Sequence, residues 1–218
     1  MKKLLLLGAL ISSVAMAANT VELRAGADLS HSGKFKGGFS DGAELNKKST
    51  KNGFELAAEY RTSLTDAWEF GGGIAYKHNK LNEEGSFEKK GIHQVPLYLT
   101  TRYNFKNSSE ITPYVKANLG YAFNSGSMKR EWRIPGLSHG KDEVKFGSGM
   151  YYGVGAGIQF KNFVVDLTWS STSTKTKFDF ETNISNPLTG SLVSEKETMN
   201  RTLRYNVVTL GFGYTFGF

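Results

Sequence analysis

Apolar and polar residues alternate with a period of two in eight segments of this 218-residue chain. In the last segment, Val208, Leu210 and Phe212 alternate with Thr209 and Gly211. Successive side chains of a strand point to opposite faces, so this pattern is typical of strands with one apolar and one polar face. The eight predicted strands cover residues 21–30, 54–61, 68–77, 94–105, 114–123, 151–160, 163–170 and 208–218.

The connections between these segments alternate in length. Residues 63–66, 106–110 and 161–162 form short connections, whereas residues 31–52, 79–92, 124–147 and 171–203 form long and polar ones. Short turns on one side and long loops on the other are typical of a transmembrane β-barrel. An even number of strands then places both termini on the short-turn side, in the periplasm.

Two local features modify this pattern. Around residues 205–207 the alternation is unclear, which allows a β-bulge there. Within the fourth long connection, Phe178 and Phe180 alternate with Asp179 and Glu181. This alternation predicts that strands seven and eight continue above the membrane as a protruding hairpin.

The apolar face has an aliphatic middle and aromatic residues at both strand ends, as in Trp68, Phe163 and Phe216 near the short turns and Tyr76 and Trp169 near the long loops. Such girdles favour contact with lipid over the inward apolar face of a lipocalin-like barrel. The sequence therefore predicts an all-β protein, an eight-stranded antiparallel up-and-down transmembrane β-barrel with long extracellular loops and short periplasmic turns.

The polar face, which would point into the lumen, is rich in glycine and charge. Its charged residues are Glu22, Arg24, Asp28, Glu55, Glu59, Arg61, Glu69, Lys77, Arg102, Lys116 and Asp166. An isolated buried charge costs several kcal/mol, so we expect these groups to pair. They would form either a structural ion-pair plug or a gate for small ions; because side chains just fill an eight-stranded interior, the plug is favoured.

The chain begins with a segment typical of exported proteins. Lys2 and Lys3 precede an apolar run over residues 4–14 and a small-x-small site at residues 15–17. These features predict a signal peptide over residues 1–17, with cleavage after Ala17 or Ala18, and a barrel domain over residues 18–218. The chain has no cysteine, which excludes disulfides and zinc–thiolate sites.

The chain ends in Gly213-Tyr214-Thr215-Phe216-Gly217-Phe218. With the signal peptide, strand count and loop alternation, this ending resembles the eight-stranded outer-membrane barrels of the OmpA/OmpX/opacity-protein type. It is similar to their assembly signal at Gly213, Tyr214, Phe216 and Phe218, although Phe212 stands where the family has a polar residue. The resemblance implies the outer membrane of a Gram-negative bacterium, with outer-membrane lipid and the barrel-assembly machinery as partners.

Enzymatic barrels of this kind carry motifs that this chain lacks. An omptin-like protease would need Asp-x-Asp with Asp-x-His, a lipid A deacylase His-x-Ser, and a palmitoyl transferase an adjacent Asp-Ser pair; none occurs. The four histidines, His31, His78, His93 and His139, lie in or beside long loops and are interpreted as solvated. We therefore expect no catalytic, metal or cofactor site and a non-enzymatic protein.

Positive charge is concentrated in the long connections. The formal net charge is +7 and falls to +5 without Lys2 and Lys3, and the long connections carry this whole excess. It would serve docking on anionic lipid head groups, or adhesion to anionic surface polymers or host receptors. No nucleic-acid-binding motif is present. The candidate ligand residues are Lys34, Lys36, Lys47, Lys48, Lys51, Lys129, Arg130, Trp132 and Arg133.

These observations leave three functional hypotheses. The first is a structural or adhesive surface protein that acts through its loops. The second is a narrow, porin-like ion-conducting barrel, and the third is a barrel enzyme that acts on envelope lipid or peptide. The missing motifs weigh against the third hypothesis.

Overall fold

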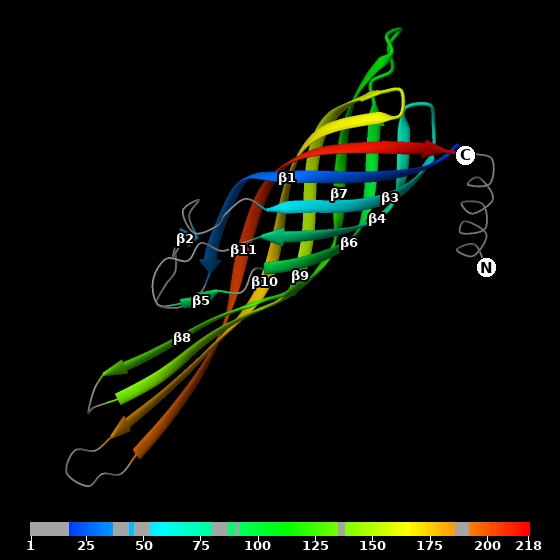
Figure 1. The fold of residues 1–218 in the computed structure, drawn as a ribbon. Helices are drawn as coiled ribbons and strands as arrows, with labels where there is room; N and C mark the ends of the chain where they lie inside the picture. The colour runs from blue at the N-terminus through cyan, green and yellow to red at the C-terminus, as the bar shows by residue number, and fades with distance from the viewer. Residues whose placement is uncertain are drawn as a thin grey trace, which may run out of the picture.

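A computed structural model describes residues 18–36, 44–45, 53–79, 87–89, 92–134, 138–185 and 192–218. The predicted signal peptide lies outside these ranges. Eight antiparallel strands form a closed ring, because β1 pairs with both β3 and β11, and the predicted eight-stranded barrel is confirmed (Figure 1). The ring strands are β1 (Asn19–Lys36), β3 (Phe54–Ser63), β4 (Trp68–Asn79), β6 (Ile92–Asn104), β7 (Ile111–Ser125), β9 (Ser138–Phe160), β10 (Phe163–Ser185) and β11 (Leu192–Gly217).

Three shorter strands lie outside the ring. Strand β2 (Glu44–Leu45) pairs with β1, while β8 (Ser127–Ile134) pairs with β9 on one side and with β5 (Phe87–Lys89) on the other. In the described part of the chain, no helix is long and apolar enough to cross a bilayer.

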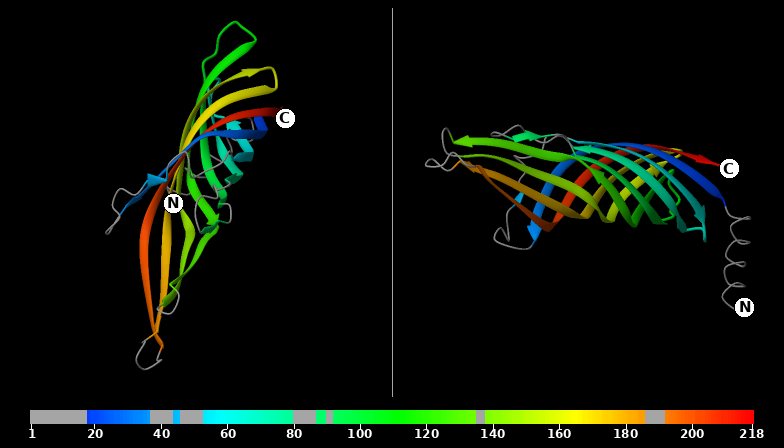
Figure 2. Two further views of the ribbon diagram at one scale, coloured as in Figure 1. Left: turned by 60° about the vertical axis from the view of Figure 1, so that its left-hand side comes forward. Right: turned by 90° about the horizontal axis from the view of Figure 1, so that it is seen from below.

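The short connections and the two ends of the described barrel lie together. The turns at residues 64–67, 105–110 and 161–162 lie at one end of the barrel (Figure 2). At the same end, the backbone amide of Asn19 donates to the carbonyl of Phe218 at 3.2 Å, and the amide of Phe218 donates to Asn19 at 3.0 Å. The last strand therefore closes the barrel against the first.

Strands β9, β10 and β11 continue far beyond the ring at the opposite end (Figure 1). Strands β10 and β11 stay paired to Ser185 and Leu192, which confirms the predicted hairpin. The expectation that residues 124–147 form a loop was wrong, because β8 and β9 form a second hairpin there. With β10 and β11 they make a four-stranded projecting sheet.

The bulge that the sequence allowed at residues 205–207 is not present. Strand β11 is unbroken there, and the register shift lies in β1 between Asp28 and Ser30. The alternation looked unclear because the polarity of the two faces reverses along β11. In the ring part of β11 the apolar Leu210 faces outward. Nearer the projecting sheet, the apolar Tyr205 and Val207 face inward and are buried.

Apolar side chains cover the outside of the ring. Leu97 and Leu119, for example, face outward and are each 58% exposed. Aromatic residues flank this aliphatic zone, with Trp68 and Phe163 toward the short turns and Trp169 toward the projecting sheet. So much exposed apolar surface is stable in a bilayer and costly in water.

Inside the projecting sheet the pattern is the opposite. Six residues form a buried apolar cluster, against which the partly buried Phe178 packs: Ile92, Val144, Phe146, Leu203, Tyr205 and Val207. The ring below has polar, charged residues on its inner face, with a smaller cluster around Tyr98 and Tyr151. An apolar layer therefore lies between the charged lumen and the tip of the sheet.

Candidate functional site

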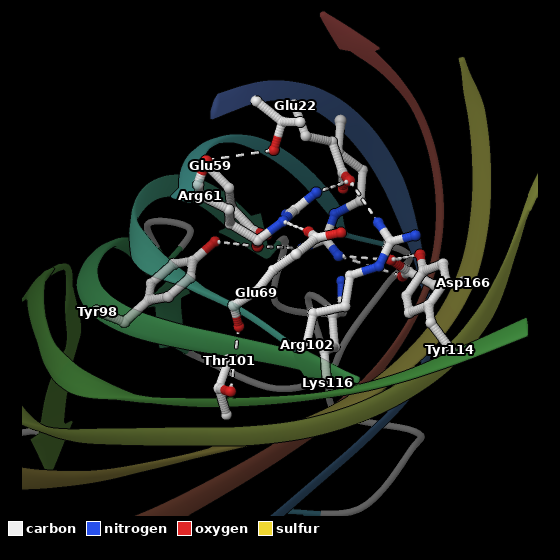
Figure 3. Close-up of polar contacts among 12 residues, drawn as sticks. Glu22, Glu59, Arg61, Glu69, Tyr98, Thr101, Arg102, Tyr114, Lys116 and Asp166 are labelled. Carbon is white, nitrogen blue, oxygen red and sulfur yellow. Dashed lines mark hydrogen bonds and ion pairs between the residues drawn. The ribbon is translucent and has the colours of Figure 1, made fainter. Parts of the chain in front are cut away.

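The eleven charged residues predicted for the lumen all face inward. Ten are buried, and Glu69 is half-buried. Ten of the eleven form ion pairs with one another, and Asp28 instead accepts a hydrogen bond from the Thr209 hydroxyl at 2.6 Å. The lumen is thus crossed by a network of charged side chains from most of the ring strands (Figure 3).

One centre of this network is Arg61 on β3. Its guanidinium donates to Glu22 at 2.7 Å, to Glu69 at 2.8 Å and to the neighbouring Glu59. Arg102 on β6 extends the group, 3.5 Å from Glu22. Because each of the three guanidinium nitrogens of Arg61 donates to a carboxylate, this side chain links β1, β3 and β4 in one fixed arrangement.

The second centre is Asp166 on β10. It pairs with Arg24 at 2.8 Å and with Lys116, and it accepts a hydrogen bond from the Tyr114 hydroxyl at 3.1 Å. Arg24 also donates to Glu55 at 2.6 Å. These contacts join strands β1, β3, β7 and β10 across the lumen.

Inward glycines make room for these long side chains. A Cβ on Gly211 would lie 2.8 Å from Cδ of Arg24 and 2.9 Å from Oδ1 of Asp166. A Cβ on Gly157 would lie 2.7 Å from both Cβ of Asp166 and Cζ of Tyr114. The inward glycines therefore leave the volume that the side chains of Arg24, Asp166 and Tyr114 occupy.

Lys77 fills the lumen toward the projecting sheet. Its ammonium group lies 2.7 Å from Glu55 and 3.0 Å from the Ser170 hydroxyl, and 5.9 Å from the centre of the Tyr151 ring. The apolar cluster of the projecting sheet follows beyond it. Chemically, the arrangement is a paired-charge plug followed by an apolar layer, and both oppose the passage of hydrated ions.

The second candidate site is the outward face of the projecting sheet. Strand register and alternation place seven basic and four acidic residues on this charged face: Lys129, Glu131, Arg133, Lys141, Glu143, Lys145, Lys175, Lys177, Asp179, Glu181 and Lys196. The apolar cluster lies on its other face. The sheet is thus amphipathic and has a net positive outer surface.

Ion pairs connect neighbouring strands on the charged face. Lys141 lies 2.9 Å from Glu131, and Lys145 bridges Glu143 at 3.1 Å and Asp179 at 3.6 Å. The hydrogen bond from Lys145 lowers the pKa of Glu143. Hydrogen bonds from Thr198 and Lys177 lower the pKa of Asp179. Glu143 and Asp179 therefore stay ionised at neutral pH, and acid weakens these pairs by protonating the carboxylates.

The predicted ligand residues fall in different places. Lys129 and Arg133 lie on the charged face, Arg130 and Trp132 lie in β8, and Lys34 and Lys36 lie in β1. Lys47, Lys48 and Lys51 lie outside the described residues. Sequence reasoning missed the part played by Lys141, Lys145, Lys175 and Lys177, although their alternation with Val144, Phe146, Thr176 and Phe178 was a usable signal.

The residues of the predicted assembly signal close the barrel. Gly213, Tyr214 and Phe216 lie in β11, and the rings of Tyr214 and Phe216 lie 4.8 Å apart. Phe218 follows the strand and is 73% exposed. This placement leaves the aromatic end of the chain on the outside of the ring, and its role in assembly stays a prediction.

Two of the four histidines lie side by side on the outside of the barrel. His78 on β4 is the cross-strand partner of His93 on β6, with their Nδ1 atoms 3.2 Å apart. The Tyr76 hydroxyl hydrogen-bonds with Nδ1 of His93 at 2.7 Å. By contrast, His31 is buried against Tyr205, and His139 is exposed on β9. Sequence reasoning did not identify this pair, because the strand register is needed to see it.

Comparisons with known proteins agree with this architecture. The family model described as "Outer membrane protein beta-barrel domain" matches residues 4–216. An uncharacterised protein of Pasteurella multocida is 24% identical over 187 residues, which cover 74% of this chain and 73% of that protein.

Three solved structures are similar at low identity. Neisserial surface protein A is 13% identical and covers 91% of this chain and 97% of its own, with a TM-score of 0.45. The attachment invasion locus protein of Yersinia pestis is 15% identical, with coverages of 92% and 99% and a TM-score of 0.43. OprG of Pseudomonas aeruginosa is 16% identical, with coverages of 92% and 96% and a TM-score of 0.44.

Proposed function

Since the chain belongs to the outer membrane protein β-barrel family, we propose that it is a non-enzymatic surface protein whose projecting sheet binds anionic polymers outside the cell. The family is that of the Gram-negative outer membrane. Both termini would lie in the periplasm, because the short turns share their end of the barrel and the long hairpins would then face outward. The observation that carries the proposal is a filled lumen combined with an ordered, charged sheet above it.

The filled lumen supports an interaction role over a transport role. Arg24, Arg61 and Arg102 are buried in the lumen. Moving one of them aside would remove an ion pair from buried carboxylates, and moving all three would leave Glu22 and Glu59 with no ion-pair partner among the described residues, which costs several kcal/mol. Ions would then still have to cross the apolar cluster that contains Phe146 and Leu203.

The projecting sheet has the properties of a binding surface. Its inner face is anchored by buried apolar side chains, so the charged face is held in a defined shape before any ligand arrives. A preorganised surface loses less conformational entropy on binding. The excess of basic over acidic side chains favours sulfated or phosphorylated polymers. Among the described residues, Arg133, Lys175 and Lys196 have no ion-pair partner, so their charges are available to a ligand.

Binding of purified protein to heparin tests the proposal. We expect the triple variant Arg133→Gln, Lys175→Gln, Lys196→Gln to lose roughly tenfold in affinity, and added salt to weaken wild-type binding by screening. The matched control is Lys106→Gln with Lys161→Gln, two exposed lysines in the short turns, which should bind like wild type. Unchanged binding of the triple variant, or binding insensitive to salt, would contradict the proposal.

A narrow ion-conducting barrel is the second candidate, because paired charges in a lumen are also what an ion-selective channel would need. Steady, large conductance of the wild-type protein in planar bilayers would favour it. For an enzyme acting on envelope lipid, the corresponding sign would be a changed lipid A mass spectrum in cells that produce the protein.

The proposed orientation is tested by treating intact cells with protease. We expect cleavage only in the long hairpins and not in the short turns.

A further inference from the structure

We propose that His78 and His93 form a surface site for one exchangeable first-row transition-metal ion, with Cu²⁺ bound most strongly. The two imidazoles are cross-strand neighbours on β4 and β6, and their ring centres lie 4.5 Å apart. Imidazole nitrogen is a preferred ligand of Cu²⁺, Ni²⁺ and Zn²⁺. The proposal is independent of polymer binding, because it concerns a different face of the molecule.

The distance between the two nitrogens fits coordination of a single ion. Two imidazole nitrogens bound to one metal, each at about 2.0–2.1 Å, lie about 2.9 Å apart at a right angle and about 3.4 Å apart at a tetrahedral angle. The observed Nδ1–Nδ1 separation is 3.2 Å, which falls between these values. Neither backbone strand would have to move for both nitrogens to reach the same ion.

Neighbouring rings hold the two imidazoles in place. Phe54 on β3 lies 5.8 Å from the ring of His78, and Tyr76 lies 6.0 Å from the ring of His93. In the metal-free protein the Tyr76 hydroxyl occupies the Nδ1 side of His93 at 2.7 Å. A bound ion would replace the hydrogen bonds at Nδ1, and each imidazole would coordinate it as the tautomer that carries its proton on Nε2.

The position of the pair allows an ion to enter from water. His78 and His93 point outward and are both partly exposed. They lie two residues beyond Tyr76 and Val95 along β4 and β6, at the edge of the apolar belt that faces the projecting sheet. Water molecules would complete the coordination, so the site would be open and exchangeable rather than structural.

Electron paramagnetic resonance of untagged full-length protein with less than one equivalent of Cu²⁺ tests the site. We expect the wild-type spectrum to show coupling to two imidazole nitrogens. His78→Gln and His93→Gln should each lose one coupling and at least tenfold in affinity for Cu²⁺. The control His139→Gln removes an exposed histidine far along the chain on β9 and should keep both couplings.

Zn²⁺ titration calorimetry gives a second measurement on the same four proteins. Wild type and His139→Gln should bind one equivalent, and the two pair variants should not. A gel that compares boiled and unboiled samples verifies that each variant is a folded barrel. Absence of two-nitrogen coupling in the wild type, or its persistence in His78→Gln, would overturn the proposal and leave the pair as interfacial rings only.

Discussion

At the scale of single residues, what a position needs depends on which side of the barrel wall it lies. Gly71 faces the lumen, and a Cβ there would lie 1.8 Å from the backbone oxygen of Tyr60. Gly72 faces outward, and a Cβ there would approach only the backbone oxygen of Tyr98, at 3.5 Å, which is an ordinary van der Waals contact. Of these two adjacent glycines of β4, only Gly71 is required by close packing, because a larger residue would overlap the neighbouring strand.

We expect Gly71→Ala to destabilise the barrel by about 1–3 kcal/mol, because the added methyl group overlaps backbone that cannot move freely. Gly72→Ala should leave stability nearly unchanged, since the methyl group enters open space in the lipid-facing wall. Urea unfolding of the two variants in lipid vesicles measures the difference. Equal effects at both positions would show that strand propensity, and not the close approach to Tyr60, determines the change in the free energy of unfolding.

At the scale of elements, the projecting sheet depends on packing in the same way as the core of a water-soluble protein. Phe146 on β9 is 5% exposed and packs in the cluster with Leu203 on β11. Lys145, its neighbour in sequence, lies on the charged face. The inner face holds the three long strands together, whereas the exposed ion pairs contribute little to stability.

We expect Phe146→Ala to cost about 3–5 kcal/mol locally, because it removes a buried aromatic side chain from a cluster with little else to replace it. Amide exchange should become faster in residues 175–185 and 192–203 while the ring strands keep their protection. Lys145→Ala, which changes the opposite face, is the control and should leave exchange nearly unchanged. Fast exchange of residues 175–200 already in the wild type would contradict the continuous hairpin.

At the scale of the whole molecule, the sequence predicted the ring well, since outward apolar and inward polar residues alternate clearly in all eight strands. The hairpin of β10 and β11 was also predictable from Phe178 and Phe180. The hairpin of β8 and β9 was not, because charged residues such as Lys129 and Glu143 outnumber the apolar ones there and the segment has the composition of a loop. The pairing of His78 with His93 depends on the register of β4 and β6, which a single sequence does not contain.

The lumen has two barriers in series, and this predicts the conductance of the protein. The charged barrier includes Arg61 and Arg102, and the apolar barrier includes Leu203 and Tyr205. In planar bilayers we expect no steady conductance from wild type, from Arg61→Ala with Arg102→Ala, or from Leu203→Ala with Tyr205→Ala. The Asp166 centre stays in place when only Arg61 and Arg102 are replaced. We therefore expect conductance only from a protein that combines all four substitutions with Arg24→Ala. Open channels in the wild type would show that the barriers do not seal the lumen.

The reversal of polarity along β11 also bears on how the barrel finds its correct pairing. Leu210 must face outward and Tyr205 inward within one unbroken strand. A slip of one residue exchanges the two faces of a strand. In β11 such a slip would turn the polar Thr209 toward lipid and, at the same time, turn Leu203 and Tyr205 of the apolar cluster toward water. A misaligned β11 would therefore lose favourable side-chain burial both in the bilayer and in the water-exposed sheet. The reversal of polarity thus helps to specify the strand register.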